Sequence, residues 1–411
     1  MPSGLLLFAL SLLQACEGGA PAWQGSITDS AGISVVHNPS TPLWGEGEGW
    51  TFSEDLRYGV STGQAEYQFG TLSGMYVDGS GHVYVVDQMA REIRVFDAQG
   101  DYLRTIGGPG SGPGEFGPDP AFVFPDGKGG VVATDPGNGR VNRYSADGTP
   151  AGSFSLDPRR GYPVRWAMDD SGRLMAQLQG LNVEGVSPLA EGDPIVVYDT
   201  TGAVVDTVVF LPKGQTLTVT DDGRLVVRYF GPEAVWVLGA NGSLHYGVSD
   251  RFKIFSTDPV GRLTRILTRA VEPKPAGEAL KQGVRAFLRR EGNKGGAPPD
   301  LIERMSADNR FPEHLPVIGR LLAGPDETIW VQRIQTTAEM AEEAEFINPR
   351  NQSLGGPEWE VFDKEGRYLG VVTLPDRYSP RRISGNHIYG VWRDELDVQY
   401  ILRFRIEKHP Q

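Results

Sequence analysis

The chain repeats itself loosely about every 40–50 residues, and this repeat limits the fold more than any other feature. The clearest copy contains three β-forming runs, at residues 83–87, 93–97 and 102–106, separated by turns rich in Gly and Asp. This order is typical of an antiparallel meander. A unit of this size cannot bury its own faces, so neighbouring copies must stack. The repeat therefore predicts an all-β protein, a β-propeller.

Six copies of the unit can be traced, which predicts six blades. Their recognisable runs begin near Gly81, Gly130, Arg173, Asp222, Thr328 and His387. The last copy lacks an outer strand, and the N-terminal region offers one. Leu56-Arg57 and Phe69-Gly70 precede Leu103-Arg104 and Phe116-Gly117 by the same 47 residues. We therefore expect residues 51–60 to complete the final blade and close the ring, which leaves few free sheet edges.

Two sequence patterns resemble catalytic or ligand-binding motifs, but turn and loop structure explains them better. The recurring Tyr/Phe-Asp-x-x-Gly motif suits a tight turn, because Asp hydrogen-bonds its own backbone and Gly adopts positive φ. The Gly-rich run Gly107–Phe116 resembles a phosphate loop, but such a loop should open a helix. Here it joins an outer strand to the next blade. We expect a structural inter-blade loop, with Phe116 packed between blades.

The composition and the N-terminus point to an extracytoplasmic protein. The net charge of −13 argues against nucleic acid or an anionic membrane surface as a partner. Residues 1–15 contain the apolar run Leu5–Leu13, which fits a signal peptide and is too short to span a bilayer permanently. Cys16, the one cysteine, follows Leu-Gln-Ala as in a bacterial lipobox, and we expect it to be lipidated. Residues 16–25 then form a tether, and residues 26–411 form the propeller, acting as a monomer.

One segment, residues 258–316 between blades four and five, departs from the β pattern and predicts a helical insertion. Three helices are expected there from apolar spacing: Leu263, Ile266, Leu267 and Ala270, then Leu280, Val284, Phe287 and Leu288, then Leu301, Ile302 and Met305. The segment either packs on the propeller with solvated charges or serves as a lid or docking arm. A second, acidic insertion is expected at residues 336–356.

No motif for catalysis is evident. His82 and His387 occupy equivalent repeat positions on one rim, so they do not converge, and no His-x-His or calcium-loop motif occurs. We therefore predict no metal site and no cofactor, although the sequence leaves open a calcium ion held in the central channel. No Gly-x-Ser-x-Gly elbow is present either.

Residues at the ends of the second strands are the candidates for ligand binding. The aligned repeats place charged, amide and aromatic side chains at one level, as in many ligand mouths. Turn formation does not require four of them, whereas two aspartates are also suited to capping their own turns. The candidates are Arg228, Arg333, Trp392 and Arg393, followed by Asp87 and Asp135.

With runs such as Val-Tyr-Val-Val-Asp, Ile-Arg-Val-Phe-Asp-x-x-Gly and Gly-x-Gly-Pro-Gly-Glu-Phe, the chain resembles the NHL-like six-bladed β-propeller lipoproteins of bacteria. The resemblance extends from about residue 26 onward. It implies the fold, and a family that includes binding scaffolds and a few enzymes with lyase or lactonase activity. Those enzymes use metal-binding His or acidic positions in the channel, which have no counterpart that can be placed here.

Two functions follow as hypotheses. The first is a lipid-anchored propeller, facing the periplasm or the cell surface, that binds a protein, peptide or glycan and is not an enzyme. The second is a metal-assisted hydrolase or lactonase-like enzyme that uses the channel. A third possibility is a structural role in an envelope assembly, carried by the insertion.

Overall fold

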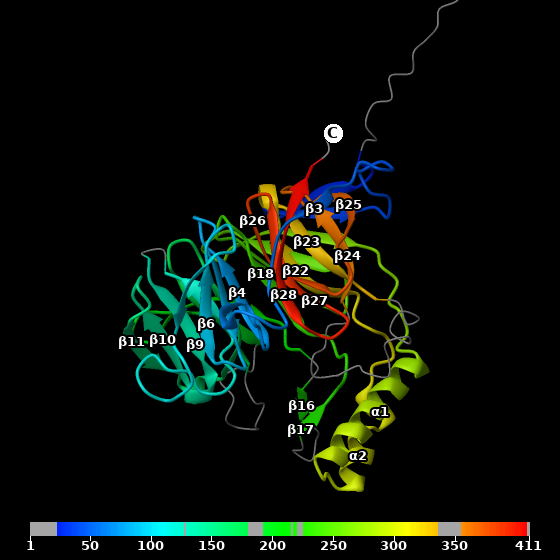
Figure 1. Ribbon diagram of the computed structural model, residues 1–411. Helices are drawn as coiled ribbons and strands as arrows, with labels where there is room; N and C mark the ends of the chain where they lie inside the picture. The colour runs from blue at the N-terminus through cyan, green and yellow to red at the C-terminus, as the bar shows by residue number, and fades with distance from the viewer. Residues whose placement is uncertain are drawn as a thin grey trace, which may run out of the picture.

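The computed structural model describes residues 23–126, 129–179, 192–214, 217–219, 225–335 and 355–408. Within these ranges, five four-stranded sheets and one six-stranded sheet form the six blades of a propeller (Figure 1). The remaining two-stranded sheet is a separate hairpin. The predicted fold class is confirmed.

In each of the first five blades, four strands run outward from the channel in chain order. The first three blades consist of β4 (Leu72–Val77), β5 (Val83–Asp87), β6 (Glu92–Phe96) and β7 (Tyr102–Ile106); β8 (Val123–Pro125), β9 (Val131–Asp135), β10 (Arg140–Tyr144) and β11 (Pro150–Ser155); and β12 (Tyr162–Met168), β13 (Leu174–Gln179), β14 (Asp193–Tyr198) and β15 (Val204–Leu211). The next two consist of β18 (Ala234–Leu238), β19 (Leu244–Val248), β20 (Lys253–Thr257) and β21 (Leu263–Arg269); and β22 (Ile318–Ala323), β23 (Ile329–Ile334), β24 (Gly355–Phe362) and β25 (Tyr368–Thr373).

The last blade closes the ring with an N-terminal strand, as the 47-residue offset predicts. It contains β26 (Tyr378–Ser384), β27 (His387–Arg393) and β28 (Gln399–Glu407), and its outer strand is β3 (Thr51–Tyr58). β3 pairs antiparallel with β28 from Ile401 opposite Tyr58 to Glu407 opposite Thr51. A strand from the N-terminal part of the chain and the last strand are therefore joined by a ladder along nearly their whole length.

The residues before β3 form a strap across three blades. β1 (Ser26–Ser30) and β2 (Ile33–Asn38) extend the fourth blade, with β2 parallel to β21. Asn38 then reaches the fifth blade, where its amide donates to the Gly366 carbonyl at 2.9 Å and its oxygen accepts from the Tyr368 N–H at 2.7 Å. The Trp44 N–H donates to the Leu369 carbonyl at 2.7 Å. The strap thus links blades four, five and six outside the ring.

The turns between third and fourth strands confirm the reading of the Asp-x-x-Gly motif. In the first blade, Asp97 Oδ1 accepts hydrogen bonds from the backbone N–H groups of Gln99 and Asp101, each at 2.9 Å. Gly100 follows with φ of 88°, a conformation that a side chain would strain. These aspartates are structural.

Two parts of the predicted register are wrong. Residues 263–269, predicted as a helix, form strand β21. The apolar spacing there also suits an outer strand that is partly exposed on both faces, so the alternation expected of a strand is weak. In the fourth blade, residues 225–227 were expected to be a blade strand. They instead form β17 (Leu225–Val227), paired with β16 (Leu217–Val219) in the separate hairpin, and Ala234–Leu238 is the innermost strand.

The helical insertion between blades four and five is confirmed for its two later helices, α1 (Glu278–Lys294) and α2 (Pro299–Met305). Leu280 and Val284 of α1 are fully buried in a cluster that also contains Tyr229, Phe311 and Ile334. Figure 1 shows both helices beside β16 and β17, at the opposite end of the molecule from the C-terminus. Because β23 ends at Ile334, the insertion packs at the end of the ring where second strands finish. The acidic insertion expected at residues 336–356 lies almost entirely outside the described residues.

A buried histidine gives the fourth blade a pH-dependent stability. His245 Nδ1 lies 2.8 Å from Ser256 Oγ, and burial, with a smaller effect of the Arg265 charge, lowers the pKa of His245 to about 4. An unfolded chain protonates histidine near pH ~6.5. Between these values the unfolded state binds more protons, so stability falls as the pH falls, by about 3 kcal/mol at pH 4. Urea denaturation at pH 7 and pH 4 should show a smaller loss for His245→Gln than for the wild type. Equal losses would contradict a neutral buried imidazole.

Candidate ligand site in the central channel

A cavity of about 740 Å³ occupies the centre of the ring. Its lining comes from the innermost segment of every blade, which confirms that the six sheets surround one axis. It extends from the middle of these strands to the turns that join first and second strands, such as Asp78-Gly79 and Asp169-Asp170. A volume of this size suits a small molecule or the end of a chain, rather than a folded partner.

Four arginines line this cavity. Arg382 covers the Tyr76 ring, and the other three come from three different blades: Arg165 on β12, Arg320 on β22 and Arg381 on β26. We call these three the channel arginines. None of them has a carboxylate within ion-pair distance in the part of the chain that the structure describes. Arg165 lies over the Trp236 ring at 5.4 Å, and Arg320 Nε donates a long hydrogen bond of 3.3 Å to Gln332 Oε1.

β-Bulges place these side chains. In β26, Arg381 is the unpaired residue of a bulge. In β22, Arg320 and its preceding neighbour lie together opposite the single residue Gln332. In β12, Arg165 directly follows the bulged residue Val164. A bulge adds a residue and changes the direction of the side chains beside it. β4 has a bulge as well, at Ser73, so four of the six innermost strands use this device, and in three of them an arginine lies in the bulge or directly beside it.

The channel arginines repel one another. Burial lowers the pKa of Arg165 to about 10. Burial, together with the charges of Arg381 and Arg165, lowers the pKa of Arg320 to about 9. Burial and the charge of Arg393 lower the pKa of Arg381. Guanidinium groups keep their proton at neutral pH, so three positive charges line one cavity with no carboxylate partner among the described residues. An anion bound there would relieve both costs.

Aromatic residues of the first two blades form another part of the cavity wall. Phe122 and Phe124 lie with parallel rings, their centroids 6.4 Å apart, and the Phe124 ring meets Tyr76 edge-on at 6.0 Å. Arg382 covers the Tyr76 ring at 4.0 Å and donates through Nη2 to its hydroxyl at 3.2 Å. Tyr76 and Phe124 are nearly buried, whereas Phe122 and Met75 are partly exposed to the cavity.

Carboxylates lie at the turn end of the same cavity, but most of them have partners. Asp169 pairs with Arg173 at 2.6 Å, Asp78 lies 3.0 Å from His82 Nδ1, and Asp326 pairs with Lys408. The positive charge therefore lies deep in the channel and the negative charge at this mouth.

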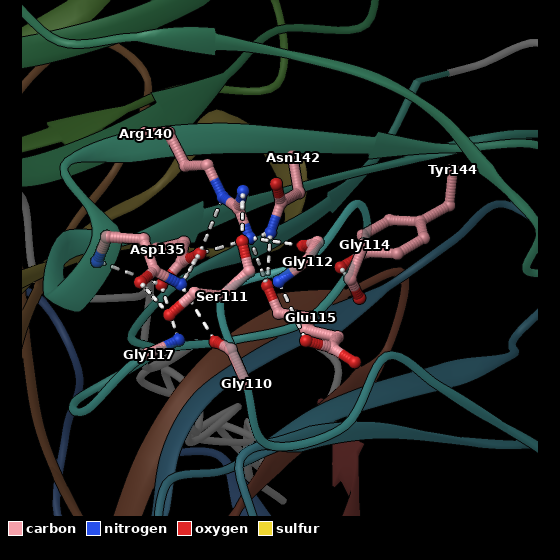
Figure 2. Close-up of polar contacts among 11 residues, drawn as sticks. Gly110, Ser111, Gly112, Gly114, Glu115, Gly117, Asp135, Arg140, Asn142 and Tyr144 are labelled. Atoms are coloured by element: carbon pink, nitrogen blue, oxygen red, sulfur yellow. Dashed lines mark hydrogen bonds and ion pairs between the residues drawn. The ribbon is translucent and has the colours of Figure 1, made fainter.

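The two aspartates predicted from the second-strand ends are both buried structural acceptors. Asp135 accepts from the Gly117 N–H at 2.9 Å, from Asn138 Nδ2 at 2.8 Å and from Arg140 Nε at 2.9 Å (Figure 2). Asp87 accepts from the Gly70 N–H at 2.8 Å, the equivalent contact one repeat earlier. Neither lines the cavity. Both cap their own turns, which is the alternative role predicted for them from the sequence.

The network in Figure 2 also establishes the role of the Gly-rich run. Arg140 Nη2 donates to the carbonyls of Gly112 and Glu115 at 2.8 and 2.7 Å, and the Tyr144 hydroxyl donates to the Gly114 carbonyl at 3.0 Å. Phe116 is fully buried in the core shared by the first blades. The run is an inter-blade loop, as predicted.

The other four predicted residues also lie outside the cavity lining. Arg333 pairs with Glu360 at 2.8 Å and with Glu358 at 2.9 Å. Trp392 donates through Nε1 to the Asp376 carbonyl at 3.1 Å, and Arg57 lies over its ring at 4.8 Å.

Arg228 and Arg393 complete the predicted set. Arg228 is exposed beside the separate hairpin, since the fourth blade has a different register from the one expected. Arg393 pairs with Asp397 at 3.0 Å, and its charge acts on Arg381, so it is the predicted residue most closely coupled to the channel arginines. A ligand contact at any of the four stays a prediction. Cys16 lies outside the described residues.

Within the described ranges, no three His, Cys, Asp or Glu side chains are grouped as metal ligands would be. His82 contacts Asp78, and His387 Nε2 contacts Asp55 at 3.2 Å, so the two histidines have separate partners. None of the helices described is long and apolar enough to cross a bilayer.

Sequence reasoning missed the channel arginines because it identified second, third and fourth strands and not the innermost ones. A usable signal was present: Gln177 and Gln332 occupy one level of the aligned second strands. Arg165 is the register partner of Gln177, and Arg320 lies opposite Gln332. Extending the alignment by one strand toward the N-terminus would have placed arginines at that level in two blades.

Comparison with known proteins agrees with this architecture. Residues 65–157 match the model of a family described as a 6-bladed beta-propeller. No curated protein matches the chain in sequence. A solved protein from Bacteroides fragilis, described as exported, aligns at 12% identity and TM-score 0.52, covering 91% of this chain and 100% of its own.

A member of the duf4221 family from Bacteroides vulgatus aligns at 11% identity and TM-score 0.54, covering 88% of this chain and 99% of its own. A virginiamycin B lyase from Staphylococcus aureus aligns at 11% identity with a TM-score of 0.45, covering 86% and 99%, a likeness too low to carry an argument. At these identities the similarity concerns the fold alone. The chain is a six-bladed β-propeller, similar in fold to these Bacteroides proteins.

Proposed function

We propose that the protein is an extracytoplasmic binding protein whose channel receives a small anionic ligand on Arg165, Arg320 and Arg381. The observation that carries the proposal is the convergence of three arginines without a described carboxylate partner. Buried charges are normally paired, and an unpaired group is costly to keep. Arginine also matches carboxylate and phosphate oxygens in a bidentate geometry.

The charge distribution supports selective binding rather than fast capture. The protein carries a net charge of −13, and the turn-end mouth bears carboxylates, so long-range attraction of anions is weak. Discrimination would therefore arise inside the channel, where the dielectric constant is low and the guanidinium groups are already in place. The same three charges disfavour a calcium ion at that level. No observation favours the alternative of a metal-assisted hydrolase.

An extracytoplasmic location rests on the N-terminus. The run Leu5–Leu13 has the length of a signal-peptide core, and Cys16 follows it in a lipobox-like context. The fold similarity to a protein described as exported is compatible with that location. We infer a lipid-anchored propeller in a bacterial envelope, with its strap leading from the anchor to blade four.

Arg320→Met should weaken anion binding without harming the fold. We expect the dissociation constant for inorganic phosphate to rise by about 10- to 100-fold, the effect of losing a charge-assisted hydrogen bond. The free energy of unfolding without anion should stay constant or rise by about 1 kcal/mol, because one member of a repelling set is removed. Titration calorimetry and urea denaturation measure the two quantities.

Arg262→Met is the matched control, because Arg262 is an exposed arginine paired with Asp258 outside the cavity. It should leave phosphate binding unchanged. Loss of binding in Arg228→Ala or Trp392→Ala, with binding retained in Arg320→Met, would place the ligand at the other end of the ring and overturn the proposal.

A further inference from the structure

We infer that the ligand is an aromatic oxyanion, a flat ring bearing a carboxylate, phosphate or sulfate group. The inference rests on the proposed function and adds the chemical class of the ligand. It comes from the composition of the cavity wall, which differs between blades. Blades three, five and six supply the channel arginines, whereas blades one and two supply Met75, Tyr76, Phe122 and Phe124.

Phe122 is the residue that would contact the ring of such a ligand. It is partly exposed to the cavity, and Phe124, two residues along the chain, also lines the cavity with its ring parallel to that of Phe122. The backbone of Phe122 is held on both sides, since its N–H donates to Thr134 Oγ1 and its carbonyl accepts from the Thr134 N–H, each at 3.0 Å. The position of the ring is thus set by strand β9 before any ligand arrives.

The aromatic wall is continuous with a further cation. Phe124 meets Tyr76, and Tyr76 lies beneath Arg382, which is adjacent in sequence to the channel arginine Arg381. Arg382 Nε is buried without a hydrogen-bond acceptor among the described residues. Aromatic rings and guanidinium groups therefore line neighbouring parts of one cavity. A ligand that carries an anionic group on an aromatic ring fits this wall better than an inorganic anion or a neutral ring.

The cavity volume sets an upper size for this ligand. About 740 Å³ holds a ring system with an anionic group and leaves room for water at the turn-end mouth. A ligand ring in contact with Phe122 would extend the pair that Phe122 already forms with Phe124, at an offset typical of aromatic contacts.

The test compares phenyl phosphate with inorganic phosphate by titration calorimetry on the mature protein. The wild type should bind phenyl phosphate about tenfold or more tightly, from ring contact and apolar burial. Phe122→Ala should bring the ratio of the dissociation constants for inorganic phosphate and phenyl phosphate close to one, while inorganic phosphate binds as before. Phe122→Leu, which keeps apolar volume without a ring, should keep only part of the ratio and guards against misfolding of the alanine variant. Phe210→Ala, an exposed phenylalanine on β15, is the control that should leave the ratio unchanged.

The outcomes separate the two proposals. If both anions bind the wild type equally and both depend on Arg320, the aromatic inference is wrong and the proposed function stands. If Phe122→Leu retains the full ratio, the wall recognises apolar volume and not a ring, which also overturns the inference. If neither anion binds, the proposed function falls, and the inference falls with it.

Discussion

Glu360→Gln is expected to lower the free energy of unfolding by about 3–5 kcal/mol, because it leaves the buried Arg269 without its counter-charge. Glu360 lies on β24 with only 2% of its surface exposed. It accepts from Arg269 Nε at 3.0 Å and from Arg333 Nε at 2.8 Å. Arg269 is on β21 of the fourth blade, so this carboxylate joins two neighbouring blades.

The surroundings of Arg269 explain why water cannot replace the carboxylate. Its guanidinium lies over the Tyr368 ring at 4.9 Å and over the Phe252 ring at 5.4 Å, and its side chain is 10% exposed. Burial alone would lower the pKa of Arg333, yet its hydrogen bonds to Glu360 and Glu358 raise that pKa overall. A guanidinium group keeps its proton at neutral pH, so the loss of Glu360 leaves a positive charge without compensation between the two blades.

Urea denaturation of Glu360→Gln and Glu358→Gln measures the effect. Glu358 pairs with the same Arg333, but its side chain is 47% exposed, so its loss should change the unfolding midpoint little. The double variant Glu360→Gln/Arg269→Leu should recover part of the stability, since it also removes one uncompensated charge. If the two single variants were equally stable, the bridge between blades would have no energetic role.

The ring itself could be predicted because its second strands are apolar throughout and its turns carry Asp and Gly at fixed places. Val83–Asp87 and Val131–Asp135 show both features, and both segments are fully buried strands. The closing strand could also be found, because Phe69-Gly70 repeats Phe116-Gly117. The glycine amides of both pairs donate to the equivalent aspartates, Asp87 and Asp135.

The fourth blade was harder to read because its second strand has lost that pattern. β19 contains His245 and Gly247, which weaken its β pattern, so the sequence predicts the stronger run Ala234–Leu238 as a later strand of the blade. The sequence then assigns the outer strand β21 to the insertion. Of the residues of β21 only Leu267 is buried, so periodicity alone does not separate strand from helix there.

The candidate site could not be predicted from the repeat, because it depends on deviations from the repeat. The innermost strands differ most between blades: one carries Pro163 and Arg165, another Gly319 and Arg320. Bulges lie at or beside these arginines, and the ring brings arginines from distant parts of the chain into one channel. Such convergence is visible only once the ring closes.

The second large effect is expected for Asp135→Ala, which should lower the free energy of unfolding by about 3–5 kcal/mol. Asp135 is fully buried and accepts hydrogen bonds from a backbone amide, an asparagine and the Arg140 guanidinium (Figure 2). Its removal leaves Arg140 without its carboxylate and frees the loop that Arg140 attaches between the first two blades. Asp135→Asn should lower the free energy of unfolding less, because one acceptor oxygen remains. Asp147→Ala is the control, since Asp147 caps an exposed turn of the same blade and should shift the urea midpoint little. A midpoint for Asp135→Ala equal to that of Asp147→Ala would show that the inter-blade loop does not depend on this network.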